Sequence, residues 1–177
     1  MFSPDRYVDA MRFAAVAHLA QQEPGQNLPY LVHVVSVAAE VIAALPVLHG
    51  IDIDLAVTSA LLHDTVEDTQ VTLDEIRARY GDAVASGVAA LTKNQTLGAQ
   101  AMADSLRRIT EQPREIAIVK LADRITNMSS PPSYWNKAKR ESYRVEAGLI
   151  ADTLGYASPE LEARLRARIA AYAAFCT

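Results

Sequence analysis

A histidine and three carboxylates lie within six residues at the end of an apolar stretch of the chain. His63 and Asp64 follow the segment Leu55–Leu62, and Glu67 and Asp68 come one helical turn later. Because side chains four residues apart share one face of a helix, His63 and Glu67 are expected to form one row. Asp64 and Asp68 form a second row beside it. Such a group predicts a metal site with its acid/base group attached.

The apolar segment decides between two interpretations of this cluster. A helix that ends in polar residues is commonly exposed to solvent at that end. Leu55–Leu62 is almost wholly apolar, however, which indicates a helix that is buried on most sides and ends inside the fold. Buried charges are unfavourable unless they are paired or bind a metal. The sequence therefore favours a metal-binding or catalytic role.

Two more residues are candidate ligands, because a site for one divalent cation needs four or more nitrogen or oxygen ligands. His33 lies on an otherwise apolar segment, and Asp123 precedes Arg124. Alone, each is weak evidence, since a single histidine on an apolar face is more often a hydrogen-bonded core residue. Together with His63 and Asp64 they complete a set of two imidazoles and two carboxylates.

Helices are expected to position these residues. Alanine, leucine, valine, arginine and glutamate dominate, glycine is scarce, and apolar positions recur every three or four residues, which predicts an all-α fold. Polar loops at 22–28, 93–98 and 129–136 are expected to form the rim of a pocket. The expected helices span residues 5–22, 29–45, from an N-cap at Asp52 or Asp54 to the His63-Asp64 pair, 72–81, 82–93, 99–110, 113–128, 137–154 and 158–175.

Composition limits the class of protein. The chain has 177 residues, half of them hydrophobic, which suits one domain over 1–177. Its net charge of −4 argues against general binding to nucleic acid or anionic membranes. The single cysteine, Cys176, predicts a reducing cytoplasm and excludes a thiolate cluster. No signal sequence or apolar run of ~18 residues is present, so we expect a soluble protein. We expect its partner to be a small molecule. A homo-oligomer is possible.

Four motifs resemble a known family. PYLVH, ALLHDTVEDT, LTK and KLADRITNM occur in the order found in the hydrolase domain of RelA/SpoT-type stringent-response enzymes, which are HD-domain metal-dependent phosphohydrolases. The similarity extends from His18 to at least Tyr143, and the length matches stand-alone small alarmone hydrolases. The resemblance implies a single helical bundle around a central metal site. It also implies a Mn²⁺-dependent enzyme that removes the 3′-pyrophosphate from guanosine 3′-diphosphate 5′-di- or triphosphate.

The resemblance assigns roles at the reaction centre. Two carboxylates and two neutral imidazoles keep the formal charge of a divalent site near zero, so a bound ion can still activate water. A carboxylate one helical turn past a metal ligand is well placed to act as a general base. The matching residues are His33, His63, Asp64 and Asp123 as metal ligands, and Glu67 and Asp68 as the acidic pair that acts on the attacking water.

Other matches concern the substrate. Asn127 and Tyr143 match residues that contact the nucleotide. Lys137, Lys139 and Arg140 lie on the helix after a double proline and are expected to bind phosphates, although a basic helix face is as often simply solvated.

Several neighbouring residues have less specific expectations. Lys93, Arg107 and Arg108 form a second basic group. Arg124 is expected to brace the carboxylates, and Tyr30 to pack in the core.

One loop departs from the family pattern. His18 and Gln21 are in place, but Glu23 and Pro24 occupy the positions of a basic pair that stacks on guanine. Glu23 is better matched to a donor such as the adenine amine, which predicts a weaker preference for guanine and use of the adenine analogue. The alternatives are another HD-type nucleotidase or dNTP hydrolase, and a regulator that binds alarmones without turnover.

Overall fold

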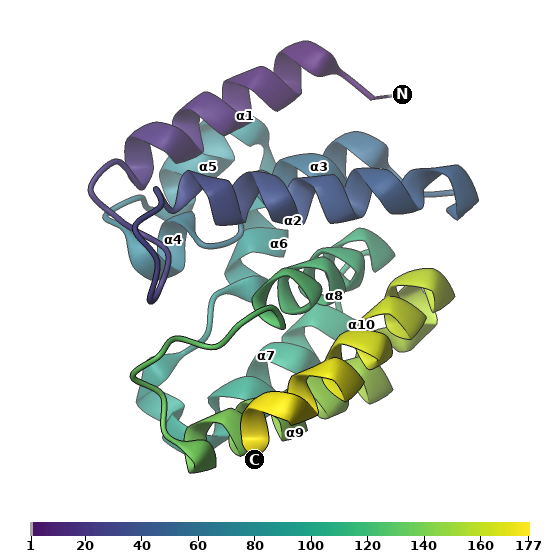
Figure 1. Ribbon diagram of the computed structural model, residues 1–177. Helices are drawn as coiled ribbons and strands as arrows, with labels where there is room; N and C mark the ends of the chain where they lie inside the picture. Colours follow the sequence, from purple (N-terminus) through teal and green to yellow (C-terminus); the bar gives the residue numbers. More distant parts are fainter. Residues whose placement is uncertain (1) are drawn as a thin grey trace.

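The computed structural model describes residues 2–177, and within them the chain is helical with no β-strand (Figure 1). The all-α expectation is confirmed. None of these helices combines the length and the apolar character that a membrane crossing requires. The α-helices are α1 (Pro4–Ala17), α2 (Leu31–Ala44), α3 (Ile53–Leu62), α4 (Thr65–Asp68), α5 (Leu73–Tyr80), α6 (Asp82–Leu91), α7 (Ala101–Thr110), α8 (Arg114–Asn127), α9 (Lys137–Leu154) and α10 (Pro159–Tyr172), with short 3-10 turns between some of them.

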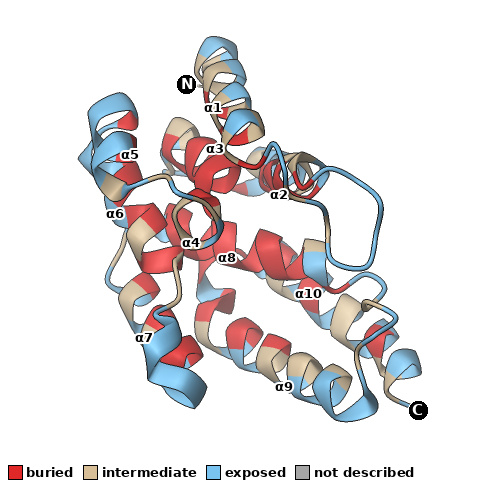
Figure 2. Ribbon diagram, turned by 90° about the vertical axis from the view of Figure 1, so that its left-hand side faces the viewer, coloured by how far each residue is buried: buried red, intermediate tan, exposed pale blue. Residues whose placement is uncertain are grey.

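Helix α8 lies at the centre of the bundle, where Figure 2 shows it buried among the other helices. Every residue from Glu115 to Ile125 is buried. Helices α2 and α3 pack on α8 and on each other, while α9 and α10 cover another side of α8. Three elements that carry candidate ligands therefore meet: α2 holds His33, α3 ends before His63, and α8 holds Asp123.

Capping residues set the helix starts as the sequence predicts. Asp52 caps α3 by accepting a hydrogen bond from the backbone N–H of Leu55 at 3.0 Å. Thr72 and Glu75 form the reciprocal capping box of α5. Ser158 caps α10. These starts matter for function, because each cap fixes where the next helix enters the bundle.

The first helix ends earlier than expected, at Ala17 instead of residue 22. Backbone hydrogen bonds from Glu23 N–H to Leu28 O at 2.9 Å and from Tyr30 N–H to Gln21 O at 3.0 Å close the following residues into a narrow loop. A turn therefore replaces the last part of the expected helix.

The helix that carries the cluster is interrupted at the cluster itself. Helix α3 ends at Leu62, beside the His63-Asp64 pair as expected, but α4 starts only at Thr65, so the expectation that His63 and Glu67 share one helical row is wrong. Two side chains satisfy the carbonyl groups freed at the end of α3. His63 Nδ1 donates to Ala60 O at 2.8 Å, and the Thr65 hydroxyl donates to Leu62 O at 2.7 Å. Side chains thus stabilise the break between α3 and α4, which contains the candidate ligands His63 and Asp64.

Candidate metal and active site

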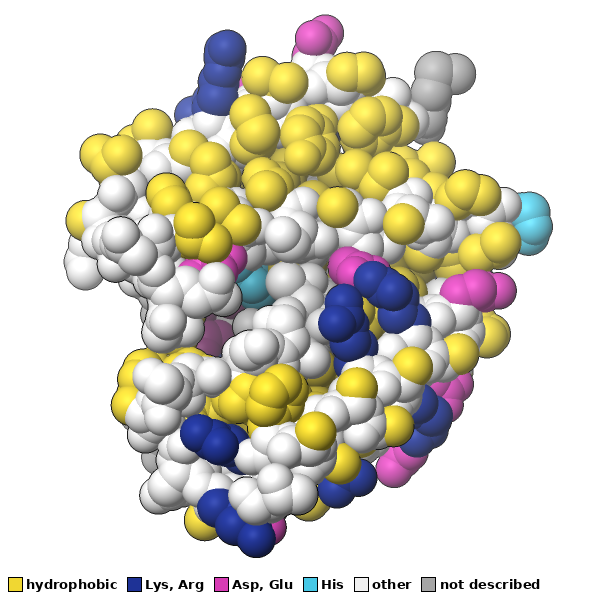
Figure 3. Space-filling model, in the orientation of Figure 1, with side chains coloured by type: hydrophobic (Ala, Val, Ile, Leu, Met, Phe, Trp, Pro, Cys, Tyr) yellow, Lys and Arg dark blue, Asp and Glu magenta, His cyan; other side chains and the backbone are white. Residues whose placement is uncertain are grey.

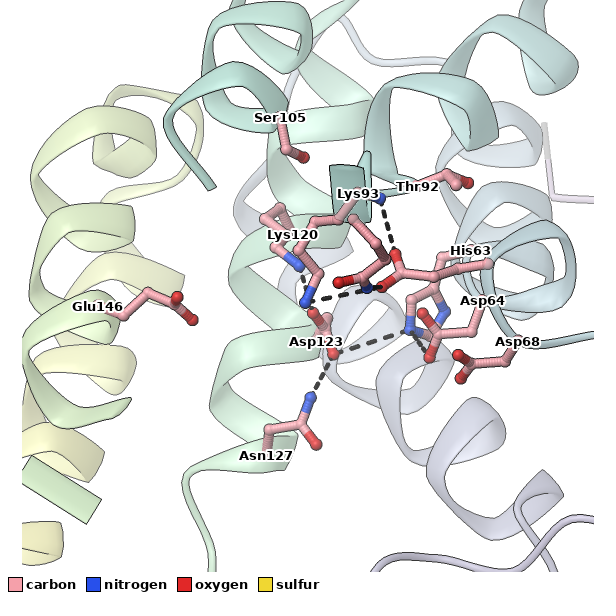
Figure 4. A network of polar contacts seen from close by, with 12 residues as sticks. His63, Asp64, Asp68, Thr92, Lys93, Ser105, Lys120, Asp123, Asn127 and Glu146 are labelled. Carbon is pink, nitrogen blue, oxygen red and sulfur yellow. Dashed lines mark hydrogen bonds and ion pairs between the residues drawn. The ribbon is translucent and has the colours of Figure 1, made fainter. Parts of the chain in front are cut away.

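Four predicted ligands converge on one buried point. His33 Nε2 lies 3.4 Å from His63 Nε2 and 3.5 Å from Asp64 Oδ2. His63 Nε2 lies 2.9 Å from the same Asp64 oxygen. Asp123 Oδ1 lies 3.6 Å and 3.7 Å from the two histidine nitrogens. Figure 4 shows His63, Asp64 and Asp123 directed toward one another. The structure therefore brings together the four residues that the sequence separates by 90 positions.

Hydrogen bonds outside the cluster orient its members. Because His63 Nδ1 donates to a backbone carbonyl, Nε2 faces the centre. The Tyr30 hydroxyl donates to Asp64 Oδ2 at 2.6 Å. Burial and the charge of Asp64 raise the pKa of Tyr30, so the hydroxyl keeps its proton and remains a donor. Tyr30 is buried as expected, but it also holds a candidate ligand, which the core-packing expectation did not include.

Lys120 and Asn127 hold Asp123 from both sides along α8. Lys120 Nζ donates to Asp123 Oδ2 at 2.9 Å, and Asn127 Nδ2 donates to Oδ1 at 2.5 Å. Burial raises the pKa of Asp123, but the charge of Lys120 outweighs it and holds the pKa well below its usual range. Asp123 is therefore an ionised carboxylate. Lys120 was not identified from the sequence, although its position one helical turn before the candidate ligand Asp123 could have indicated an ion pair.

These donors fit a divalent cation. The ligand atoms of His33, His63 and Asp64 all lie within 4.8 Å of one another, and Asp123 adds a second carboxylate. Imidazole and carboxylate are the ligands that Mn²⁺, Fe²⁺ and Zn²⁺ accept, which makes a resident divalent ion the simplest account of four titratable groups at one buried point. When bound, such an ion supplies Lewis acidity toward a phosphoryl oxygen and a water molecule.

Metal uptake is expected to release about one proton at pH 8. Burial lowers the pKa of His63, but the charges of Asp64 and Asp123 outweigh it and raise the pKa to about 10 in the metal-free protein. The Nε2 proton must leave before the ring can bind a metal, so affinity should rise with pH up to that value. Calorimetric titration of metal-free protein with Mn²⁺, in buffers of different ionisation enthalpy, measures the number of protons released per ion bound. The His49→Ala variant, altered at an exposed histidine, should give the same number. Uptake without proton release would contradict the assigned charge state.

The predicted acidic pair lies on α4, just beyond the cluster. Glu67 Oε2 accepts a hydrogen bond from the backbone N–H of Lys93 at 2.8 Å, and Oε1 accepts from Gln95 Nε2 at 3.3 Å. Lys93 Nζ lies 3.7 Å from Oε1. Asp68 is exposed and accepts from Gln21 Nε2 at 3.3 Å. These contacts fix the position of Glu67 more firmly than that of Asp68. Their roles toward water stay predictions.

A cavity of about 670 Å³ opens beside the cluster, with His33 in its wall. Figure 3 looks onto this hollow, with histidine and acidic side chains visible inside and basic ones beside it. Loops 23–28 and 129–135 supply part of the rim, as the sequence predicts. The loops approach closely: a Cβ on Gly25, whose φ is +76°, would lie 3.0 Å from Pro132.

The predicted substrate residues divide into two groups. Glu23, Asn127, Lys139 and Tyr143 line the cavity. Lys137 and Arg140 do not belong to its lining, and their contact with phosphate stays an untested prediction.

Arg124 does not brace the ligand carboxylates as expected. It pairs with Glu146 at 2.5 Å and lies over the Tyr143 ring at 4.2 Å, so it holds a wall of the cavity.

The second basic group also separates. Lys93 lines the cavity, whereas Arg107 and Arg108 pair with Asp104 on α7. Two other lining residues, Trp135 and Arg168, were not identified from the sequence, because no local motif marks them.

Comparison with known proteins places this arrangement among characterised folds. The pattern that defines the HD domain matches residues 10–157. A solved structure described as a metazoan ortholog of SpoT that hydrolyses ppGpp superposes with a TM-score of 0.82 over 95% of this chain and 96% of that one. Its sequence identity of 23% supports the fold alone.

Two sequence relatives differ in how much of their length this chain covers. The guanosine-3′,5′-bis(diphosphate) 3′-pyrophosphohydrolase MESH1 of Xenopus tropicalis is 30% identical over 166 residues, which are 89% of each chain. A "Probable GTP pyrophosphokinase" of Mycobacterium leprae is 38% identical over 143 residues, which are 76% of this chain and 17% of that protein. The chain thus spans nearly all of the first relative and a small part of the second.

Proposed function

The chain belongs to the HD-domain family, and we propose that it is a metal-dependent 3′-pyrophosphohydrolase of nucleoside 3′,5′-bis(diphosphate) alarmones. The single observation that carries the proposal is the set of two histidines and two carboxylates beside a cavity whose wall includes His33, with an acidic pair on α4. The names of the MESH1 relatives support the same substrate class. The proposal takes residues 1–177 as one catalytic domain that acts on a small molecule in the cytoplasm.

The reaction needs a nucleophile, a proton acceptor and a held leaving group. In the proposed mechanism Glu67 takes a proton from the attacking water, which bonds to the phosphorus next to the 3′ oxygen. The bond between that phosphorus and the 3′ oxygen breaks, the oxygen takes up a proton, and pyrophosphate leaves. Lys93 lines the cavity and lies 3.7 Å from Glu67, where it can also neutralise phosphate charge. Asn127 fixes Asp123 and faces the same cavity.

The metal is proposed to be Mn²⁺, held by His33, His63, Asp64 and Asp123. A donor set of two nitrogens and two oxygens suits Mn²⁺ but does not by itself exclude Fe²⁺ or Zn²⁺. The ion that restores the highest rate to metal-free protein identifies it.

One assay separates the proposal from its alternatives. Purified protein with Mn²⁺ is incubated with guanine and adenine 3′-pyrophosphorylated nucleotides and with dNTPs, and the products are resolved by chromatography. Pyrophosphate together with a nucleotide that has a free 3′ hydroxyl supports the proposal. Release of triphosphate or phosphate from dNTPs alone favours another HD-type hydrolase. Tight alarmone binding without product indicates a regulator.

The Glu23→Arg substitution is expected to shift base preference toward guanine. Glu23 lines the cavity, and its ionised carboxylate can accept the adenine amine hydrogen bond but cannot donate to guanine O6 or N7. We therefore expect the unmodified protein to use the adenine analogue as well as or better than (p)ppGpp. One such contact is worth ~1–3 kcal/mol, roughly 5- to 150-fold in relative kcat/KM.

Competing-substrate kinetics with both nucleotides measures this ratio. Glu111→Arg, which makes the same charge change at the exposed C-cap of α7, outside the cavity lining, is the matched control and should leave the ratio unchanged. Strong guanine preference in the unmodified protein would remove the functional meaning of the loop change.

A further inference from the structure

We propose that Arg168 of α10 binds a phosphoryl group of the substrate that is remote from the reacting one, so that the cavity contains a second anion subsite. The inference rests on the proposed function and names the part of the substrate that this residue recognises. In a nucleoside 3′,5′-bis(diphosphate) the remote group is the 5′-diphosphate.

Arg168 is part of the cavity wall although it lies outside the matched HD pattern. It is half-buried and lines the same cavity as His33, whereas the pattern ends at residue 157. Helix α10 packs on α8 and α9, which brings its inner face to the cavity. This arginine thus lies outside the segment that the family pattern matches.

Two carboxylates of the cavity wall, Glu40 and Glu146, are already paired with other arginines. Arg164, one turn earlier on the same face of α10, makes a two-pronged ion pair with Glu40 of α2, with both distances at 2.6 Å. Glu146 in the cavity wall pairs with Arg124. Among residues 2–177, Arg168 has no carboxylate within 4.0 Å and no hydrogen-bond partner for its side chain. The ion pairs of this cavity wall therefore leave the guanidinium of Arg168 without a carboxylate partner.

The remaining basic side chains of the cavity are committed elsewhere. Lys93 lies 3.7 Å from Glu67, and Lys139 lies over the Trp135 ring at 5.2 Å. Arg168 is therefore the cavity cation in the described structure that has neither a carboxylate nor an aromatic ring as its partner. A half-buried cation without a counter-charge is a site where an anion gains most from binding.

The position suits an anion that is not the one at the metal cluster. His33 and Glu40 are seven residues apart on α2, which corresponds to about 10 Å along the helix. Arg164 pairs with Glu40, so the inner face of α10 lies opposite the α2 segment beyond His33. Arg168 follows Arg164 by one turn on this face and lines the cavity together with His33, and the proposal places at Arg168 a second phosphoryl group, on another arm of the ligand. The planar guanidinium binds phosphate oxygens with two parallel hydrogen bonds, which a lysine cannot do.

The test compares Arg168→Gln with Arg166→Gln, a matched control on the outer face of α10 that pairs with Asp152 and Glu162. Each protein is assayed with nucleoside 3′-diphosphates that carry or lack a 5′-diphosphate. Calorimetry measures the binding of a nucleoside 5′-diphosphate, which has no 3′-phosphate and does not depend on turnover. For Arg168→Gln we expect KM for the 5′-phosphorylated substrate to rise about 10- to 100-fold, with kcat unchanged. The affinity for the nucleoside 5′-diphosphate should fall by a similar factor.

The substrate that lacks 5′-phosphates should show the same KM in all variants, and Arg168→Lys should recover only part of the loss. Equal losses for both substrates, or none for either, would overturn the subsite. If the unmodified protein hydrolyses no 3′-pyrophosphorylated nucleotide, the proposed function fails. In that case calorimetry alone decides on Arg168: binding that weakens only in Arg168→Gln supports the subsite, and absent or unchanged binding refutes it.

Discussion

The His63→Ala protein is expected to bind no metal and to show no hydrolysis above that of the chelated enzyme. His63 Nε2 lies within 3.7 Å of His33, Asp64 and Asp123, so its removal takes away the donor at the centre of the set. Asp64 then loses its nearest imidazole, and Asp123 keeps only that of His33. Asp123→Ala should have the same effect, and it leaves the buried Lys120 without its carboxylate partner.

Elemental analysis and a hydrolysis assay with excess Mn²⁺ measure the two losses together. The unmodified protein should hold about one ion per chain, because one cluster provides one site. Chelation should stop its turnover, and added metal should restore it. His49→Ala is the control for the loss of an exposed histidine. Thermal unfolding separates loss of metal from loss of fold. An active, metal-free protein would refute the site assignment.

Glu67→Gln should lower turnover by ~10²-fold or more, the usual contribution of a general base. The amide keeps the size of the side chain and can still accept the backbone hydrogen bond from Lys93, but it cannot take a proton from water. Metal content and substrate affinity should therefore stay as in the unmodified protein.

Single-turnover rates and calorimetric affinities test this separation of chemistry from binding. Glu111→Gln, at an exposed ion pair of α7, is the control and should turn over normally. Turnover of Glu67→Gln near that of the control would make Glu67 a structural residue that holds Lys93 and Gln95 in place.

The sequence predicted the ligand set because each ligand lies on, or directly after, a helix whose own pattern marks it as buried. His33 stands on the apolar face of α2, and Asp123 stands on a helix with buried residues on all sides. Capping residues such as Thr72 and Ser158 fixed helix starts, since a cap is a local signal. The three helices α2, α3 and α8 leave few ways to bury their apolar faces together.

The features that were missed depend on contacts between distant segments. The break between α3 and α4 arises from side-chain hydrogen bonds of His63 and Thr65 that a periodicity argument does not contain. Arg124 was assigned to the carboxylates because they adjoin it in sequence, but Glu146, 22 residues away, is its partner. Nothing local distinguishes Arg168, in the cavity wall, from Arg166, which faces away.

Helix α2 supplies two separate points of the cavity wall. It carries His33 at the reaction centre and Glu40, the anchor of Arg164, seven residues further along. Hydrogen bonds inside the helix hold the backbone positions of His33 and Glu40 about 10 Å apart. If Arg168, one turn after Arg164, binds the second phosphoryl group as proposed, the ion pair between α10 and α2 sets how far apart the two anionic arms of a ligand must lie. Ligands are then selected by the distance between their two phosphoryl groups, and this selection requires no contact with the base.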